Sequence, residues 1–184
     1  MIEDKKRWND KYLENPMPST VSPLVKKYIE EATVGQAMDV ACGTGRNTHF
    51  LADLGFCVDA VDISDYALSK IKNSATINKI DADLDKYNLM PNKYDLIVNI
   101  NFLNRRLVSQ MKESLKVGGV VIFETFTIAH GDFKMPTTNL DYLLRKNELL
   151  HSFIGLDTIY YEERIDMNQN GERVKVASLV ARKS

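Results

Sequence analysis

The most constraining feature of this 184-residue sequence is an apolar run that stops at two closely spaced glycines. Residues 37–41 form the run, Gly43 and Gly45 lie in the turn, and residues 46–54 continue with the apolar spacing of a helix. We therefore predict a buried strand, a tight turn and a helix in direct succession. Such a turn exposes bare backbone at a helix N-terminus, where a ligand can approach the chain closely.

An acid ends the next apolar run. Residues 57–62 predict a second strand, and Asp62 is its last residue. A carboxylate in this place can accept hydrogen bonds from both hydroxyls of a ribose. The sequence thus predicts a site for a nucleoside-bearing cofactor.

The glycine spacing separates the cofactors that such a turn can bind. A dinucleotide fingerprint carries a third glycine, whereas this sequence has Thr48 in that position. Asp39, four residues before the first glycine, would repel a pyrophosphate but suits a cationic amino-acid moiety. A phosphate-binding Walker loop is excluded because no Gly-Lys-Ser/Thr sequence follows. A nicotinamide-dependent oxidoreductase is therefore the disfavoured alternative.

Apolar runs and helical patterns alternate along the rest of the chain. This order predicts an α/β fold, namely a Rossmann-like, doubly wound, mostly parallel seven-stranded sheet with a C-terminal antiparallel hairpin. We expect one domain over residues 1–184, with residues 1–33 as an N-terminal helical segment or lid. Further helices are expected at 24–32, 64–72, 107–115 and 140–153, and further strands at 77–82, 94–100, 120–123, 157–165 and 174–181.

Composition and charge argue against several other classes of protein, namely nucleic-acid-binding, membrane, secreted and metal-binding proteins. The formal net charge of −1 gives no basic footprint for nucleic acid. No apolar run approaches the ~20 residues that span a bilayer, and no signal-peptide core is visible, so we expect a cytoplasmic protein without a membrane partner. The three histidines lack the spacing of metal ligands, and we predict no metal site. Cys42 and Cys57 are interpreted as small packing residues.

Short motifs lie at the ends of the predicted strands in a fixed order. Asp-x-Ala-Cys-Gly-x-Gly at 39–45 is followed by motifs at 62–64, 81–84, 94–97 and 115–119. Together they resemble the class I S-adenosylmethionine-dependent methyltransferases. The forms Gly-Thr-Gly-Arg-Asn at 43–47 and Trp-Asn-x-x-Tyr at 8–12 are similar to the small bacterial members of the tellurite-resistance type.

The resemblance implies S-adenosylmethionine as the cofactor and assigns residues to its parts. The methionine part would contact Asp39, Ala41, Cys42, Gly43 and Gly45, followed by Arg46 and Asn47; the ribose would bind Asp62; the adenine would contact Ile63, Asp83 and Leu84; and the sulfonium side would face Asn99. Ala41 stands where many members carry glycine, which is tolerated if its backbone angles are ordinary.

Several of these residues have a structural alternative. Asp39 could cap the following helix, and Asp83 could be a turn residue. Trp8 and Tyr12, four apart on a predicted helix, could form a packing pair or cover the cofactor.

The predicted function is methyl transfer to a small-molecule acceptor with release of S-adenosylhomocysteine. The main alternative is a catalytically silent S-adenosylmethionine-binding regulatory protein. The acceptor pocket is expected between the N-terminal segment and residues 125–139, with His130 and Arg105 as candidate catalytic residues. A nucleic-acid enzyme is disfavoured because no Asn/Asp-Pro-Pro-Tyr motif follows the fourth strand. The acceptor and the oligomeric state stay open.

Overall fold

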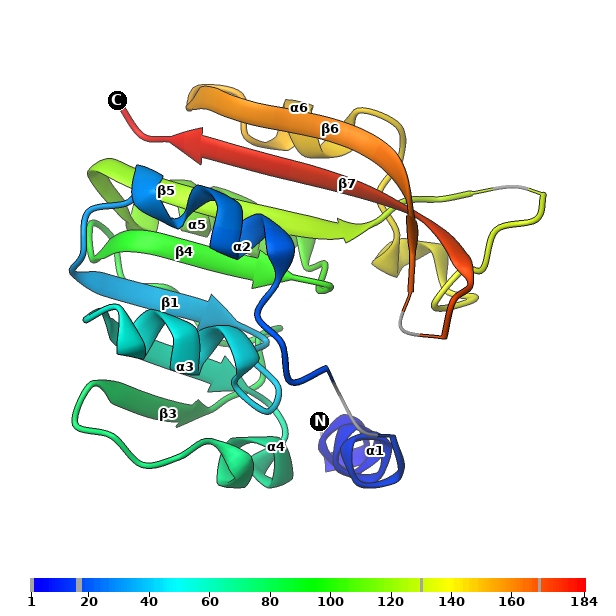
Figure 1. The fold of residues 1–184 in the computed structure, drawn as a ribbon, viewed down its shortest axis with the longest axis horizontal. Coiled ribbons are helices and arrows are strands. Elements are labelled where there is room, and N and C mark those ends of the chain that lie inside the picture. The colour runs from blue at the N-terminus through cyan, green and yellow to red at the C-terminus, as the bar shows by residue number, and fades with distance from the viewer. Residues whose placement is uncertain (1, 16–17, 130, 169) are drawn as a thin grey trace.

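The fold is organised by one seven-stranded sheet in the order β3-β2-β1-β4-β5-β7-β6 (Figure 1). The computed structural model describes residues 2–15, 18–129, 131–168 and 170–184. Neighbouring strands from β3 to β5 are parallel, and β7 is antiparallel to both β5 and β6. The predicted α/β class and the antiparallel C-terminal hairpin are therefore confirmed. The strands are β1 Gln36–Val40, β2 Cys57–Asp62, β3 Ile77–Asp81, β4 Tyr94–Ile100, β5 Leu115–Phe126, β6 Asp157–Met167 and β7 Arg173–Arg182.

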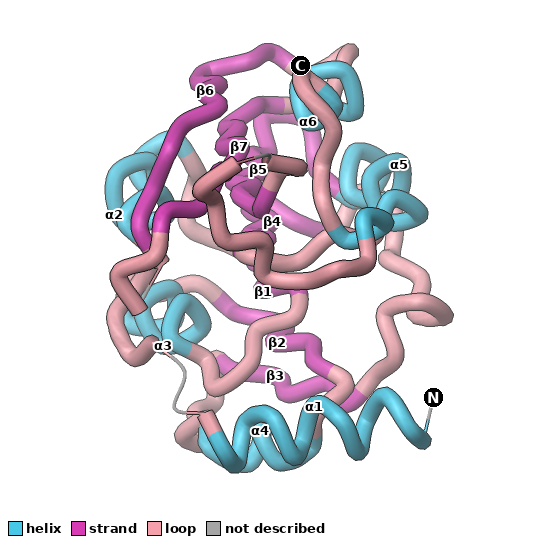
Figure 2. Tube along the Cα trace, turned by 90° about the vertical axis from the view of Figure 1, so that its right-hand side faces the viewer, coloured by secondary structure: helices cyan, strands magenta, loops and turns pink. Residues whose placement is uncertain are grey.

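Helices cover both faces of the sheet, as Figure 2 shows: α2 and α3 lie on one side, and α5 and α6 on the other. Helix α1 lies beyond the β3 end of the sheet, alongside α4. Within the described chain, no helix combines the length and apolar character needed to cross a membrane. The helices are α1 Ile2–Glu14, α2 Pro23–Tyr28, α3 Arg46–Asp53, α4 Asp65–Lys70, α5 Arg105–Ser114 and α6 Glu148–Ser152, with short 3-10 turns at η1 Ile29–Glu31 and η2 Leu140–Tyr142.

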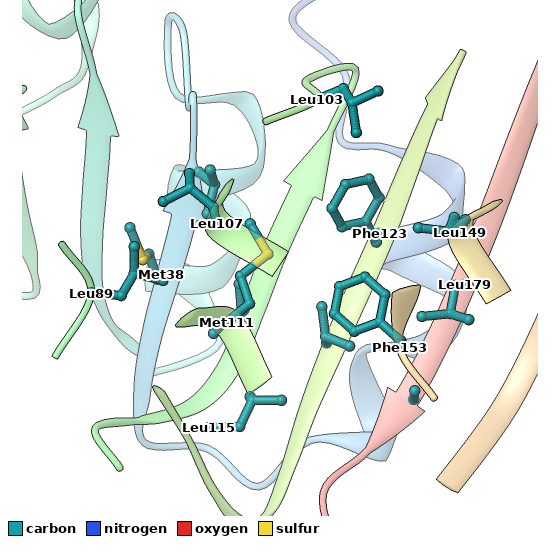
Figure 3. Close-up of a cluster of buried hydrophobic side chains, with 14 of the residues drawn as sticks. Met38, Leu89, Leu103, Leu107, Met111, Leu115, Phe123, Leu149, Phe153 and Leu179 are labelled. Carbon is teal, nitrogen blue, oxygen red and sulfur yellow. The ribbon is translucent and has the colours of Figure 1, made fainter. Parts of the chain in front are cut away.

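A continuous apolar cluster fills the space between the sheet and the helices α5 and α6 (Figure 3). Met38 of β1 and Met111 of α5 are almost completely buried there. Phe123 of β5 packs against Phe153, with ring centroids 5.6 Å apart. Because this core includes β1, β4 and β5, it fixes the carboxyl ends of these strands, where ligands bind in open α/β sheets.

Two expected boundaries are wrong. The helix predicted over 140–153 is interrupted, because Asn147 adopts a positive φ of 61° just before α6. The strand predicted over 120–123 is longer, because β5 begins at Leu115, directly after α5 ends at Ser114, and includes Gly118 and Gly119. A Cβ atom on Gly119 would lie 2.8 Å from the carbonyl oxygens of Lys116 and Tyr94, so only glycine permits this close approach of two backbones.

Candidate cofactor-binding site

The glycine turn connects β1 to α3 at the carboxyl edge of the sheet. Gly43 and Gly45 have φ values of 55° and 84°, in the left-handed region that glycine enters without steric cost. A Cβ atom would lie 2.9 Å from the Tyr12 hydroxyl oxygen at Gly43, and 2.7 Å from Cγ1 of Ile71 at Gly45. Both the backbone angles and the packing therefore require glycine here.

Asp62, at the end of β2, links its own strand to this turn. Its carboxylate is buried; Oδ2 accepts a hydrogen bond from the Gly43 peptide N–H at 2.8 Å, and Oδ1 accepts one from the Ser64 peptide N–H at 2.9 Å. Burial raises the pKa of Asp62, and these backbone donors oppose the rise. An ionised carboxylate has about four acceptor positions, and the Tyr12 hydroxyl is a further donor to this one, so a ligand hydroxyl would take the place of Tyr12.

Asp39 lies inside β1 and faces the first turn of α3. It is 1% exposed, and its Oδ2 accepts a hydrogen bond from the Thr48 hydroxyl at 2.7 Å. The residue in the place of the third glycine therefore fastens the strand to the helix. Sequence reasoning missed this role for Thr48, although its position one turn into the helix, facing the strand, was a usable signal. The contact fits the structural alternative for Asp39, and its role beside an ammonium group stays a prediction.

Burial raises the pKa of Asp39 from its ordinary 3.8 to about 7, although the Thr48 hydroxyl opposes the shift. Between about pH 4 and pH 7 the unfolded chain has released this proton while the folded chain retains it, so this group lowers stability as the pH rises. We expect Asp39→Asn to remove this loss. Urea denaturation at pH 4.5 and pH 7.5 measures the free energy of unfolding of both proteins. From the lower to the higher pH, this free energy should fall less, or rise more, in the variant than in the unaltered protein. An equal change in the free energy of unfolding for both proteins would contradict a raised pKa of Asp39.

Ala41, at the start of the turn, departs from expectation. Its φ is 51°, in the left-handed region, so the expectation of ordinary backbone angles is wrong. The left-handed conformation costs a residue with a Cβ atom roughly 1–2 kcal/mol. The turn therefore retains local strain where the resembling proteins carry glycine.

Ala41→Gly is expected to raise the free energy of unfolding by up to ~1 kcal/mol, because relief of the strain exceeds the entropic cost of glycine, about 0.5–1 kcal/mol. Urea denaturation measures this change. Ala37→Gly is the matched control: Ala37 is buried in the same strand, outside the residues with positive φ, and its replacement should destabilise the protein. Destabilisation by both substitutions would contradict the strain at Ala41.

Helix α1 docks against the segment that follows β2 through polar contacts. Asn9 accepts a hydrogen bond from the Ser64 hydroxyl at 2.6 Å and donates one to Asp65 at 2.7 Å. Lys5 forms ion pairs with Asp81 at 2.5 Å and with Asp65 at 3.3 Å. Among the α1 side chains that the structure describes, none belongs to the buried hydrophobic core.

The aromatic pair of α1 lies over the glycine turn. The Tyr12 ring is within 3.4 Å of a Cβ position built on Gly43, and its hydroxyl lies close to Asp62. Burial and the Asp62 charge raise the pKa of Tyr12. Trp8 packs on Tyr12 with ring centroids 5.8 Å apart. The two interpretations of this pair are compatible, because the rings pack together and also cover the turn.

Asn99, at the end of β4, lies beside β1 in register with Val40. It is completely buried, and its Nδ2 donates to the Phe102 carbonyl oxygen at 2.8 Å. Its Oδ1 has no hydrogen-bond partner within the described ranges. A buried acceptor without a partner costs roughly 1–3 kcal/mol. Asn99 thus offers an unused acceptor at the edge of the sheet where a cofactor is expected.

The remaining predicted cofactor residues vary in accessibility. Ile63 is half-buried beside Asp62, whereas Leu84 is buried in the core. Asp83 accepts a hydrogen bond from the Asp85 peptide N–H, as a turn residue does. Cys42 is buried, which raises the pKa of its thiol and argues against a nucleophile. Cys57 is exposed, so its predicted packing role is wrong.

The candidate catalytic residue Arg105 has its partners among residues 141–148. Arg105 binds Glu148 through Nε at 2.5 Å and through Nη2 at 3.0 Å, and it donates to the carbonyl oxygens of Asp141 and Leu143. Because these bonds occupy its guanidinium, Arg105 fastens a loop to α5, and its catalytic role stays a prediction. His130 lies outside the described residues.

Comparison with known proteins places these features in context. The family model described as tellurite resistance protein TehB matches residues 1–180. The chain is 28% identical over 166 residues to a probable S-adenosyl-L-methionine-dependent methyltransferase TehB of Haemophilus influenzae, over 80% of this chain and 57% of the relative. A putative methyltransferase of a Geobacillus species is 26% identical over 163 residues, with 80% and 64% covered. The chain thus spans less than two thirds of the length of these relatives.

The fold also matches a solved structure. The crystal structure of TehB from Haemophilus influenzae superposes with a TM-score of 0.77 and 23% sequence identity. The match covers 96% of this chain and 67% of that chain. The two chains therefore share the same fold.

Proposed function

Because the chain belongs to the TehB family, we propose that it transfers a methyl group from S-adenosylmethionine to a small-molecule acceptor and releases S-adenosylhomocysteine. The observation that carries the proposal is the junction of Gly43 and Asp62. There, two peptide N–H groups hold one buried carboxylate beside the glycine turn, and Tyr12 covers that turn. A nucleoside with a cationic amino-acid arm, rather than a pyrophosphate, suits this junction.

The residues at the junction fit the parts of this cofactor. The two oxygens of the Asp62 carboxylate suit two ribose hydroxyls, which would displace the Tyr12 hydroxyl from it. The unpaired Oδ1 of Asn99 suits the positively charged sulfonium side, and we assign Asp39 to the ammonium group. We assign Ile63 to the adenine, as the resemblance implies. The bound cofactor supplies a methyl group on a positively charged sulfur.

Methyl transfer from sulfur is an in-line displacement, so the protein acts mainly by alignment and by exclusion of water. Holding the reactants in the correct orientation can lower the activation free energy by up to ~7–11 kcal/mol relative to the reaction in solution. The strands β1, β2 and β4 provide rigid positions for Gly43, Asp62 and Asn99. Helix α1, with Trp8 and Tyr12, would form the cover that excludes water.

A small acceptor is favoured by the charge of the chain. The formal net charge of −1 provides no general field to attract a polyanion. The aromatic rings of α1 beside polar atoms resemble the apolar walls and few polar groups of a small-molecule pocket. We propose residues 1–184 as one domain, with residues 1–33 as its N-terminal lid or helical segment, in which α1 is the part that covers the turn.

A screen of acceptors with S-adenosylmethionine tests this function, with S-adenosylhomocysteine quantified by mass spectrometry. Turnover that depends on one class of small molecule supports the proposal. Tight cofactor binding without turnover on any acceptor would favour the silent regulatory alternative. Turnover only with a nucleic acid, and salt-dependent binding to it, would replace the proposed substrate class.

A further inference from the structure

One side chain of α1 occupies both the glycine turn and the carboxylate beside it. The Tyr12 hydroxyl oxygen lies 2.9 Å from a Cβ position built on Gly43, and two ring carbons of Tyr12 lie 3.3 and 3.4 Å from the same position. The hydroxyl also donates a hydrogen bond to the buried carboxylate of Asp62. Tyr12 therefore covers the backbone of the turn and holds the acceptor that we assign to the ribose.

The rest of α1 is held by polar groups at the same edge of the sheet. Asn9 accepts from the Ser64 hydroxyl and donates to Asp65. Lys5 pairs with Asp65 and with Asp81. Ser64 and Asp65 come directly after β2, and Asp81 is the last residue of β3. The helix is thus docked on the ends of the two strands next to the assigned ribose position.

These contacts come from one face of the helix. Lys5, Asn9 and Tyr12 follow one another at intervals of four and three residues, a spacing that places them on one side of an α-helix. The three docking contacts therefore form and break together when this face moves.

The Asp62 carboxylate cannot serve this face and a ribose at once. It already accepts hydrogen bonds from the peptide N–H groups of Gly43 and Ser64 and from the Tyr12 hydroxyl. A carboxylate has about four acceptor positions, and two ribose hydroxyls would need two of them. The Tyr12 hydroxyl must therefore leave before both ribose hydroxyls can bind.

We propose that α1 is a self-inhibiting gate, whose docked position competes with the cofactor because Tyr12 and the ribose claim the same carboxylate. The inference rests on the proposed function, since it concerns entry to that same site. Opening removes the Tyr12 ring from Gly43 as well as the hydroxyl from Asp62. After the cofactor has bound, α1 can return over it as the cover, with Tyr12 off the carboxylate. The apparent affinity is then lower than the intrinsic affinity by the fraction of open protein.

Tyr12→Phe tests the gate, because it removes the hydroxyl and keeps the ring. We expect the variant to bind S-adenosylhomocysteine roughly 3- to 10-fold more tightly than the unaltered chain, since the docked state loses the hydrogen bond that competes with the ribose. Calorimetry gives the dissociation constants, and circular dichroism checks the fold. Equal or weaker binding by the folded variant would overturn the gate, because a hydroxyl that only supports the bound cofactor cannot oppose its entry.

Trp8 reports the movement of α1 directly. It is the only tryptophan in the sequence, and it packs on Tyr12 with ring centroids 5.8 Å apart. In stopped-flow mixing with S-adenosylhomocysteine, we expect a change in Trp8 fluorescence whose rate reaches a limit at high ligand concentration, because opening precedes binding.

Lys5→Gln should raise this limiting rate about 2- to 5-fold, since it removes the ion pairs that hold the docked helix. Lys6→Gln is the matched control: it makes the same charge change at the adjacent, exposed lysine of α1, and it should leave the rate unchanged. Equal rates for the two variants would overturn the gate and leave the proposed function standing. Failure of the unaltered chain and of every variant to bind S-adenosylhomocysteine would overturn the gate and the proposed function together.

Discussion

Asp62→Ala is expected to weaken S-adenosylmethionine binding by about 2–5 kcal/mol, because both ribose hydroxyls lose their acceptor. The structure adds a second cost. The peptide N–H groups of Gly43 and Ser64 also lose their acceptor, and an unpaired buried donor costs roughly 1–3 kcal/mol. We therefore expect a lower free energy of unfolding as well.

Calorimetry and urea denaturation separate these two effects. Asp53→Ala is the control, since Asp53 is an exposed acid at the end of α3, and it should change neither quantity by more than ~0.5 kcal/mol. If Asp62→Ala is folded under the assay conditions and binds the cofactor with unchanged affinity, the ribose lies elsewhere.

Removal of residues 1–12 is expected to reduce turnover roughly tenfold or more, because the reacting groups lose the cover that excludes water. The melting temperature should change little. The contacts of α1 with Ser64, Asp65 and Asp81 are polar and largely at the surface, where an ion pair contributes about 0–1 kcal/mol. Turnover and thermal unfolding of the truncated and full chains provide the comparison.

Tyr12→Phe and Trp8→Ala in the full chain show which part of the cover matters. The first removes only the hydroxyl near Asp62, and the second removes the ring that packs on Tyr12. A truncated protein that methylates as fast as the full chain would eliminate the cover, and the acceptor pocket would then need other walls.

The sheet could be predicted because its strands are short apolar runs separated by helical spacing. The turn could be predicted because Gly43 and Gly45 interrupt such a run. The sign of φ at Ala41 could not, since alanine seldom adopts a positive φ and no pattern in the sequence marks it. The break in the predicted helix at 140–153 has a similar origin at Asn147.

The candidate site was predictable where one residue type suits one ligand group. Asp62 follows that rule, and the structure places it beside the glycine turn. Arg105 does not, because an arginine at a helix start can equally bind an anion or nearby carbonyl groups, and only the path of residues 141–148 decides between them. The hydrogen bond of Tyr12 to Asp62 carries no sequence signal; it is visible only in the folded chain.

Calorimetric titration of the full chain with S-adenosylmethionine, S-adenosylhomocysteine and NAD tests the central claim most directly. The junction of Gly43 and Asp62, with Thr48 in place of a third glycine, predicts saturable binding of the first two ligands and no binding of NAD. Saturable NAD binding without binding of S-adenosylmethionine would contradict it.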